Sequence, residues 1–151
     1  MCAVIDTLRP FGGIALALVL LAGCGGKKPP SAASVVKSWV DSVRTGDFQR
    51  ANELFALPSV VFNGLPKMTL TKRAEVDAFN RSLPCGAELQ HTQAEAAGHL
   101  LATFKLVAAG PDRPCTGSVG AVARVSFLVE DGKITEWFRE STSPPPGSQE
   151  A

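Results

Sequence analysis

The sequence predicts one α+β domain in which three N-terminal helices pack on an antiparallel sheet of four or more strands. Between residues 33 and 83, apolar residues recur every three to four positions, which is the spacing of one helix face. After Cys85 they recur at every second position, which is the spacing of one strand face. The pairs Ala97-Gly98 and Asp131-Gly132 interrupt this alternation and predict tight hairpin turns.

The first predicted helix begins near residue 33 and presents one apolar stripe. Gly46 is expected to end this helix, because glycine readily adopts the left-handed conformation of a C-cap. The stripe consists of Val35, Val36, Trp39, Val40 and Val43.

Two further helices are expected before Cys85. Asp47 is positioned to cap the second helix, DFQRANELF, and Pro58 to end it, with SVVFNG as a short extended segment. The third helix, TKRAEVDAFNRSL, is expected to start after a Thr71 cap. Asp77 falls beside the apolar stripe of this helix and is expected in solvent. The stripe itself consists of Ala74, Val76, Phe79 and Leu83.

Four strands are expected after the helices. Their predicted ranges are 87–96, 99–107, 119–129 and 133–140. Arg124 lies on the mixed face of the third strand. The opposite face is uniformly apolar and should contact the helices; it comprises Ala121, Ala123, Val125, Phe127 and Val129.

Residues 1–23 are typical of an export signal. An uncharged apolar run at 11–21 follows Arg9 and is shorter than the roughly 20 residues that span a bilayer. Its end, Leu21-Ala22-Gly23-Cys24, resembles the lipobox of bacterial lipoproteins, which implies cleavage before Cys24 and acylation of its thiol. The alternatives are an ordinary secretory signal or an uncleaved apolar helix that carries a cysteine. We therefore expect a protein lipid-anchored to the cell membrane or outer membrane and facing outside the cytoplasm.

The predicted domain occupies residues 33–140 and is flanked by segments without apolar periodicity. Residues 24–32 are rich in Gly, Lys and Pro and predict a flexible tether between lipid and domain. Residues 141–151 include three consecutive prolines and predict a disordered tail.

Two of the four cysteines are expected to form a disulfide. Cys2 would leave with the leader and Cys24 would be acylated, so Cys85 and Cys115 remain in a compartment where disulfides persist. A bridge closing this loop is worth roughly 3.5 kcal/mol in the chain-entropy model. The alternative is a redox or nucleophilic thiol, which neither a CxxC spacing nor an adjacent His supports.

The composition argues against several classes of function. The formal net charge is +1 and basic residues are scattered, which argues against nucleic-acid binding. The chain has two histidines and its acidic residues are not clustered at ligand spacing, so neither a metal site nor a cofactor is expected. It has no tyrosine, a common oxyanion donor in enzymes.

Several phrases resemble one known family. VVKSWVDSVRTGDFQRANELF, LTKRAEVDAFNRSL and VSFLVEDGKITEWFRE are similar to the helices and the closing hairpin of nuclear transport factor 2-like (NTF2-like, SnoaL-like) domains. The resemblance implies a cone-shaped α+β fold in which a curved sheet wraps the long helix around an apolar cavity. The family includes isomerases, epoxide hydrolases, polyketide cyclases and members without known catalysis, and its members often form homodimers through the sheet.

The aromatic residues supply the candidate ligand site. Trp39, Phe104 and Phe127 are expected to converge inside the cone, and Phe62 and Trp137 are further candidates for its walls. The leading hypothesis is a membrane-anchored protein that binds a small apolar ligand there without catalysis. A module that contacts another envelope protein is an alternative.

His91 carries the enzymatic alternative. Alternation places it on the same face as Leu89 and Gln93, at the mouth of the cavity, where it could act as a base near Glu95 in an isomerase or hydrolase. The plainer interpretation is a strand histidine in solvent. An epoxide-hydrolase-like cluster would instead need Arg124 and Asp77 turned inward. His99, at a strand start, is expected in solvent.

Overall fold

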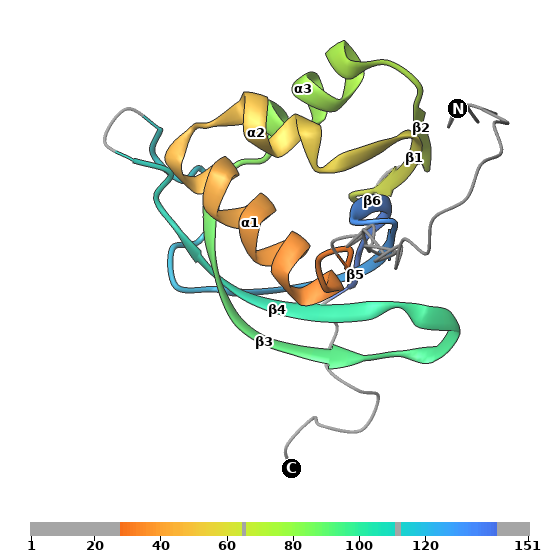
Figure 1. Ribbon diagram of the computed structural model, residues 1–151. Coiled ribbons are helices and arrows are strands. Elements are labelled where there is room, and N and C mark those ends of the chain that lie inside the picture. Colours follow the sequence, from red (N-terminus) through yellow and green to blue (C-terminus); the bar gives the residue numbers. More distant parts are fainter. Residues whose placement is uncertain (1–27, 65, 111–112, 142–151) are drawn as a thin grey trace, which may run out of the picture.

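The predicted α+β architecture is confirmed, with a larger sheet than the four strands counted from the sequence (Figure 1). The computed structural model describes residues 28–64, 66–110 and 113–141. The helices are α1 (Ala32–Thr45), α2 (Phe48–Glu53) and α3 (Arg73–Ser82), with a short 3-10 turn, η1 (Ala96–Gly98). The strands are β1 (Phe55–Phe62), β2 (Met68–Leu70), β3 (Gly86–Ala94), β4 (Leu100–Val107), β5 (Val122–Glu130) and β6 (Lys133–Arg139).

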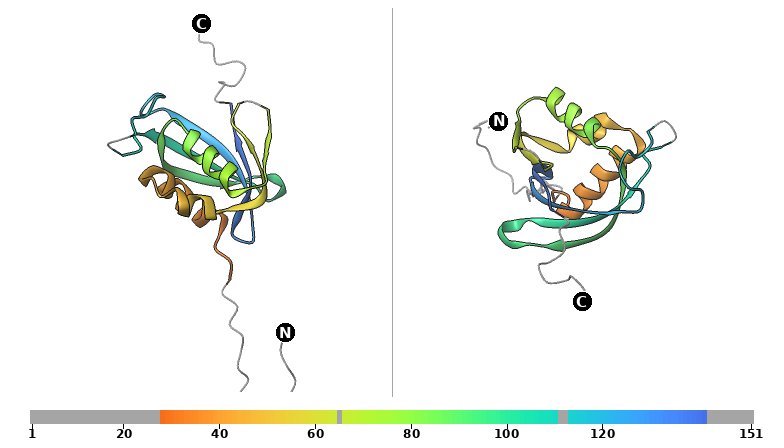
Figure 2. Two further views of the ribbon diagram at one scale, coloured as in Figure 1. Left: turned by 90° about the horizontal axis from the view of Figure 1, so that it is seen from above. Right: turned by 180° about the vertical axis from the view of Figure 1, so that it is seen from behind.

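The six strands form one mixed sheet in the order β2-β1-β6-β5-β4-β3. All neighbouring strands are antiparallel except β1 and β6, which are parallel. The sheet is curved and does not close, and it wraps around α1 on its concave side (Figures 1 and 2). The concave face of the sheet therefore packs against the apolar side of α1.

Both ends of α1 are fixed by local contacts. The Ser31 hydroxyl accepts a hydrogen bond from the backbone N–H of Ser34 at 3.2 Å, which caps the first turn. Gly46 adopts a left-handed φ of 80° and ends the helix, as predicted. The predicted stripe is buried along its whole length, because α1 lies between the sheet and the other two helices.

The prediction that the second helix runs to Pro58 is wrong. α2 ends at Glu53, and the following residues enter the sheet as β1. The Ile134 N–H donates to the Leu54 carbonyl at 2.8 Å, and Phe55 then pairs with Ile134. Pro58 is tolerated in this strand because it lies at a register shift between Phe55 and Val60, where the missing N–H breaks no regular ladder.

The start of the third helix also differs from the prediction. Lys72, rather than Thr71, is the N-cap residue. The Glu75 carboxylate accepts hydrogen bonds from the backbone N–H groups of Thr71 at 2.6 Å and Lys72 at 3.2 Å. Glu75 thus satisfies the two N–H groups that immediately precede α3, and its negative charge suits the positive end of the helix dipole.

Both predicted hairpin turns are present. Asp131 and Gly132 have φ values of 48° and 75°, and Ala97 and Gly98 have φ values of 56° and 80°. Positive φ at both central residues matches the right-handed twist of the flanking strands. The β5–β6 hairpin is closed by pairing of Glu130 with Lys133.

The core is an aromatic cluster centred on Trp39. Its ring makes edge contacts with Phe55, Phe104, Phe127 and Trp137, at centroid distances between 5.5 and 6.5 Å. These partners come from four strands, so one side chain of α1 joins most of the sheet. Within the described residues, no helix is long and apolar enough to span a membrane.

A buried polar chain runs from this core to the surface. The Trp39 indole N–H donates to Asn80 Oδ1 at 2.9 Å, and Asn80 Nδ2 donates to Asn52 Oδ1 at 2.8 Å. Asn52 Nδ2 in turn donates to the Asp77 carboxylate at 2.8 Å, which also accepts from Arg81 Nε at 2.6 Å. The chain links α1, α2 and α3 and satisfies an asparagine that is fully buried.

Candidate functional site

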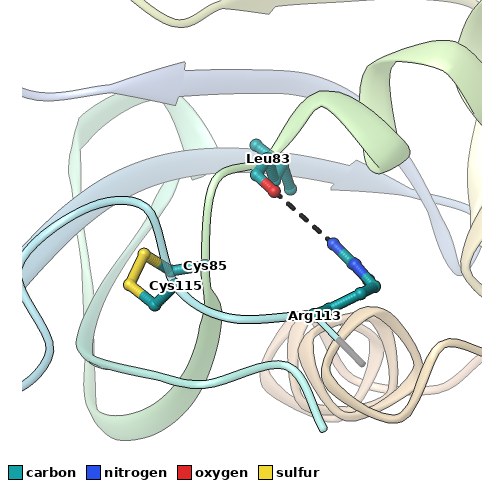
Figure 3. Close-up of a disulfide and its surroundings, with 4 residues drawn as sticks. All are labelled: Leu83, Cys85, Arg113 and Cys115. Carbon is teal, nitrogen blue, oxygen red and sulfur yellow. Dashed lines mark hydrogen bonds between the residues drawn. A yellow bond between two sulfur atoms is a disulfide. The ribbon is translucent and has the colours of Figure 1, made fainter. Parts of the chain in front are cut away.

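The predicted disulfide between Cys85 and Cys115 is confirmed (Figure 3). It joins the residue before β3 to the connection between β4 and β5. The same connection is held by Arg113, whose guanidinium donates to the carbonyls of Val43 at 3.3 Å and Leu83 at 3.5 Å. The bridge and the arginine therefore fasten this connection to the ends of α1 and α3.

A cleft of about 80 Å³ opens beside this disulfide. A cavity of about 150 Å³ holds a benzene molecule, which has six non-hydrogen atoms, so the enclosed part of this cleft has room for about three. Its apolar wall comes from α1, from the segment after α3 and from four strands; it comprises Trp39, Leu83, Pro84, Cys85, Ala87, Phe104, Leu106, Ala123, Val125 and Trp137. Asn63 and Arg139 complete the lining.

The predicted aromatic residues are divided between the cleft and the core. Trp39, Phe104 and Trp137 line the cleft, whereas Phe127 is fully buried behind Trp39 at a centroid distance of 5.5 Å. The rings of Trp39 and Phe104 are in edge contact at 6.3 Å. The expected convergence is therefore confirmed, but the space between these rings is filled and the cleft lies to one side of them.

Phe62 does not line the cleft. It pairs with Phe138 in the parallel β1–β6 ladder, next to Val61, which is fully buried on the concave face. Because successive residues of a strand point to opposite faces, Phe62 and Phe138 lie on the convex face of the sheet.

The predicted position of His91 is wrong. A register shift at Gln90 makes Leu89 pair with Phe104 but His91 pair with Thr103. Paired residues share a face, and Phe104 is on the concave side, so His91 is on the convex side and exposed. The structure thus does not bring His91 to the cleft.

The other expected polar residues also lie away from the cleft. Arg124 is exposed on the convex face, and Asp77 contacts Arg81 and Asn52. Hydrogen bonds from Arg81 and then from Asn52 lower the pKa of Asp77 below its usual value. An acid-arginine-acid constellation built on Arg124 and Asp77 is therefore not assembled in the cleft.

His99 is not in solvent as expected. Its Nε2 lies 3.0 Å from a carboxylate oxygen of Glu136, and its ring stacks on Phe138 at 6.5 Å. Nearby, the Ser126 hydroxyl donates to Glu95 at 2.7 Å. His99, Ser126 and Glu95 line a shallow groove that also contains Phe138, Arg139 and Glu140. Arg139 therefore borders both this groove and the cleft. Within the described ranges, no three His, Cys, Asp or Glu side chains are grouped to hold a metal ion.

The polar side of the cleft was missed by the sequence analysis. Arg139 is the one charged residue of the lining. Its hydrogen bond is a long contact of 3.4 Å to Asn63 Oδ1, and no carboxylate in the described part of the chain forms an ion pair with it. The sequence did indicate the position of Arg139. It lies two residues after Trp137 in the same strand, and residues two apart in a strand share a face.

The two tryptophans of the cleft differ in their hydrogen bonding. The Trp39 indole N–H donates to Asn80, whereas the Trp137 indole N–H is buried without an acceptor among the described residues. A buried donor without an acceptor costs about 1–3 kcal/mol. The cleft wall therefore holds one unsatisfied polar group.

Solved structures show which fold this geometry represents. An NTF2-like protein of unknown function from Cytophaga hutchinsonii is similar with a TM-score of 0.57 and 10% identity, covering 76% of this chain and 93% of that one. A putative ketosteroid isomerase from Kribbella flavida matches with a TM-score of 0.54 and 17% identity over 77% and 83% of the two chains. The chain has an NTF2-like fold.

Other proteins of this fold have different activities. An epoxide hydrolase from M. tuberculosis is similar to this NTF2-like chain with a TM-score of 0.51 and 20% identity, over 70% and 74% of the two chains. No protein-family model and no curated protein sequence matches the chain. Because identities of this size establish only the fold, the function has to be argued from the cleft itself.

Proposed function

We propose that this NTF2-like domain is a membrane-anchored binding protein that holds a small apolar molecule in the cleft beside Trp39 and does not act on it chemically. The observation that carries the proposal is the cleft lining. Ten of its residues present apolar surface, and neither of the other two, Asn63 and Arg139, is an acid or an imidazole. Such a lining supplies shape and apolar area for binding but no general base.

The size of the cleft limits the ligand. About three non-hydrogen atoms fit inside, so the buried part of the molecule is comparable to the end of a short acyl chain, and the rest of the ligand lies at the open mouth. Burial of such a group is favoured by roughly 25 cal/mol per Å² of apolar surface. The disulfide and Arg113 hold the rim in place, which reduces the loss of conformational freedom on binding.

Anchoring through an acylated Cys24 is the second part of the proposal. The predicted leader, residues 24–27 of the tether, which include Cys24, and residues 142–151 of the tail lie outside the described residues, so the anchor rests on the lipobox-like sequence. The start of the domain is compatible with it: Pro30 lies against Gly132, just before the first residue of β6, whereas Arg139 is the last residue of that strand.

Intrinsic fluorescence tests the binding function, because both tryptophans of the chain line the cleft. The probe is hexan-1-ol, which has seven non-hydrogen atoms and no charge. We expect a saturable change in emission for the wild type. Ala123→Phe, which fills the cleft, should abolish it, and the matched control Val122→Phe on the exposed convex side of the same strand should not. Equal responses from both variants would contradict the proposal.

A further inference from the structure

We infer that the ligand of this cleft carries a negative charge, and that Arg139 selects small apolar carboxylates over neutral and cationic molecules of the same size. This inference rests on the proposed binding function and specifies its ligand class. The first observation is that the one charged side chain in the lining has no ion pair within the described residues.

The lining of the cleft carries positive but no negative charge. Arg139 approaches it from β6, and on the opposite side Arg113 donates to the carbonyl of Leu83, a residue of the cleft wall. Arg113 is held by this carbonyl and by the ring of Phe48, at 4.8 Å from its guanidinium, rather than by an acid. With no carboxylate in the lining, the Arg139 guanidinium contributes positive potential at the rim of the cleft, which favours an anion.

The buried indole of Trp137 supplies a second reason. It lies two residues before Arg139 on the same face of β6, about 6.6 Å along the strand, and its N–H has no acceptor in the described structure. The Trp137 ring lies in the cleft wall while its N–H is shielded from water, so a ligand oxygen would accept from the N–H once the ring turns toward the cleft. A carboxylate has two acceptor oxygens, and it could bond Arg139 with one while the other satisfies this donor.

The polar and apolar parts of the cleft are arranged for an amphiphilic ligand. Trp39, Phe104 and Val125 are buried, whereas Arg139 is exposed at the rim. The carboxylate would therefore sit at the rim, where it keeps part of its hydration, and the hydrocarbon part would enter the cleft. This placement avoids the high cost of burying an ion away from water.

A matched ligand series tests the inference: hexanoate, hexan-1-ol and hexylammonium, titrated at pH 7 by tryptophan fluorescence and calorimetry. Because Arg139 is exposed, its ion pair is screened, so we expect hexanoate to bind up to about fivefold more tightly than the alcohol. Hexylammonium should bind more weakly than the alcohol. Added salt should reduce the preference for hexanoate and leave the alcohol unchanged.

Variants separate Arg139 from the general charge of the protein. Arg139→Gln should lower hexanoate affinity to that of the alcohol, Arg139→Lys should restore part of the preference, and the control Arg124→Gln on the convex face should behave as the wild type. Equal binding of the three ligands to the wild type would overturn this inference, and so would an undiminished preference for hexanoate over hexan-1-ol in Arg139→Gln. Neither result would contradict the proposed binding function. Failure of all three to bind would overturn both.

Discussion

Trp39 and Asn80 form a buried hydrogen bond of 2.9 Å that joins the cleft to the helical layer. Asn80 is fully buried, and its other side-chain group donates to Asn52. The bond fixes the plane of the Trp39 ring, which forms part of the cleft wall and contacts four other aromatic rings. The shape of the cleft therefore depends on a polar residue that does not touch it.

Asn80→Ala should destabilise the fold. It leaves the Trp39 N–H and Asn52 Oδ1 without their partners in a buried environment, and an unsatisfied buried group costs about 1–3 kcal/mol. We expect a loss of this size in the free energy of unfolding, measured with urea. Gln90→Ala, an exposed change, should stay within about 0.5 kcal/mol of the wild type. Equal effects of the two variants would refute the structural importance of the bond.

Asp77 should make the stability of the domain dependent on pH. Its pKa is lowered in the folded state by hydrogen bonds from Arg81 and Asn52. Its contribution is therefore fully present above the unfolded pKa of about 3.9 and is lost as the pH falls through the lower folded value. The stability difference between the wild type and Asp77→Asn should shrink between pH 6 and pH 3. A difference that grows over this interval would have the wrong sign.

Removal of the disulfide should lower both stability and binding. Loss of a native bridge typically costs about 2–4 kcal/mol, which corresponds to a fall in melting temperature of about 10 °C for a domain of this size. Because Cys85 lines the cleft, the Cys85→Ala, Cys115→Ala double variant should also bind hexan-1-ol more weakly. Scanning calorimetry and fluorescence titration measure the two effects. An unchanged melting temperature would show that the bridge carries no stability.

Cys24 should determine where the protein resides. In a bacterial host that acylates lipoproteins, we expect the mature wild-type chain to begin at acylated Cys24 and to fractionate with membranes. Cys24→Ala should accumulate as precursor or as soluble product, detected by mass spectrometry of the N-terminal peptide. An unacylated soluble wild-type protein would contradict the lipobox assignment.

The helices and the four long strands could be predicted because their signals are local. The stripe of α1 and the alternation in β5 identify Trp39 and Phe127 as core residues without knowledge of the sheet order. The second half of β1 was predicted as the extended segment SVVFNG, but its first half could not be found in this way, because Phe55 joins the sheet by pairing with Ile134, far away in the sequence. Such non-local pairing produces no alternation of apolar and polar residues near Phe55. That segment also matched the helical spacing of the second predicted helix.

The candidate site was predicted less completely than the fold. The alternation rule gave His91 the wrong face, because one extra residue at Gln90 reverses every side chain that follows it. The same rule applied to β6 would have placed Arg139 beside Trp137, but an exposed arginine near a strand end does not stand out in a sequence. The unpaired N–H of Trp137 depends on its neighbours in three dimensions and has no sequence signal.

Native mass spectrometry of the full-length protein purified from its host membrane tests the central claim most directly. If the cleft beside Trp39 binds a small molecule, the wild type and Val122→Phe should retain a low-mass adduct, and Ala123→Phe, with its cleft filled, should lack it. The same purification reports the mass of any acyl group on Cys24. An adduct that persists in Ala123→Phe, or its absence from the wild type under conditions that preserve the fold, would contradict the account.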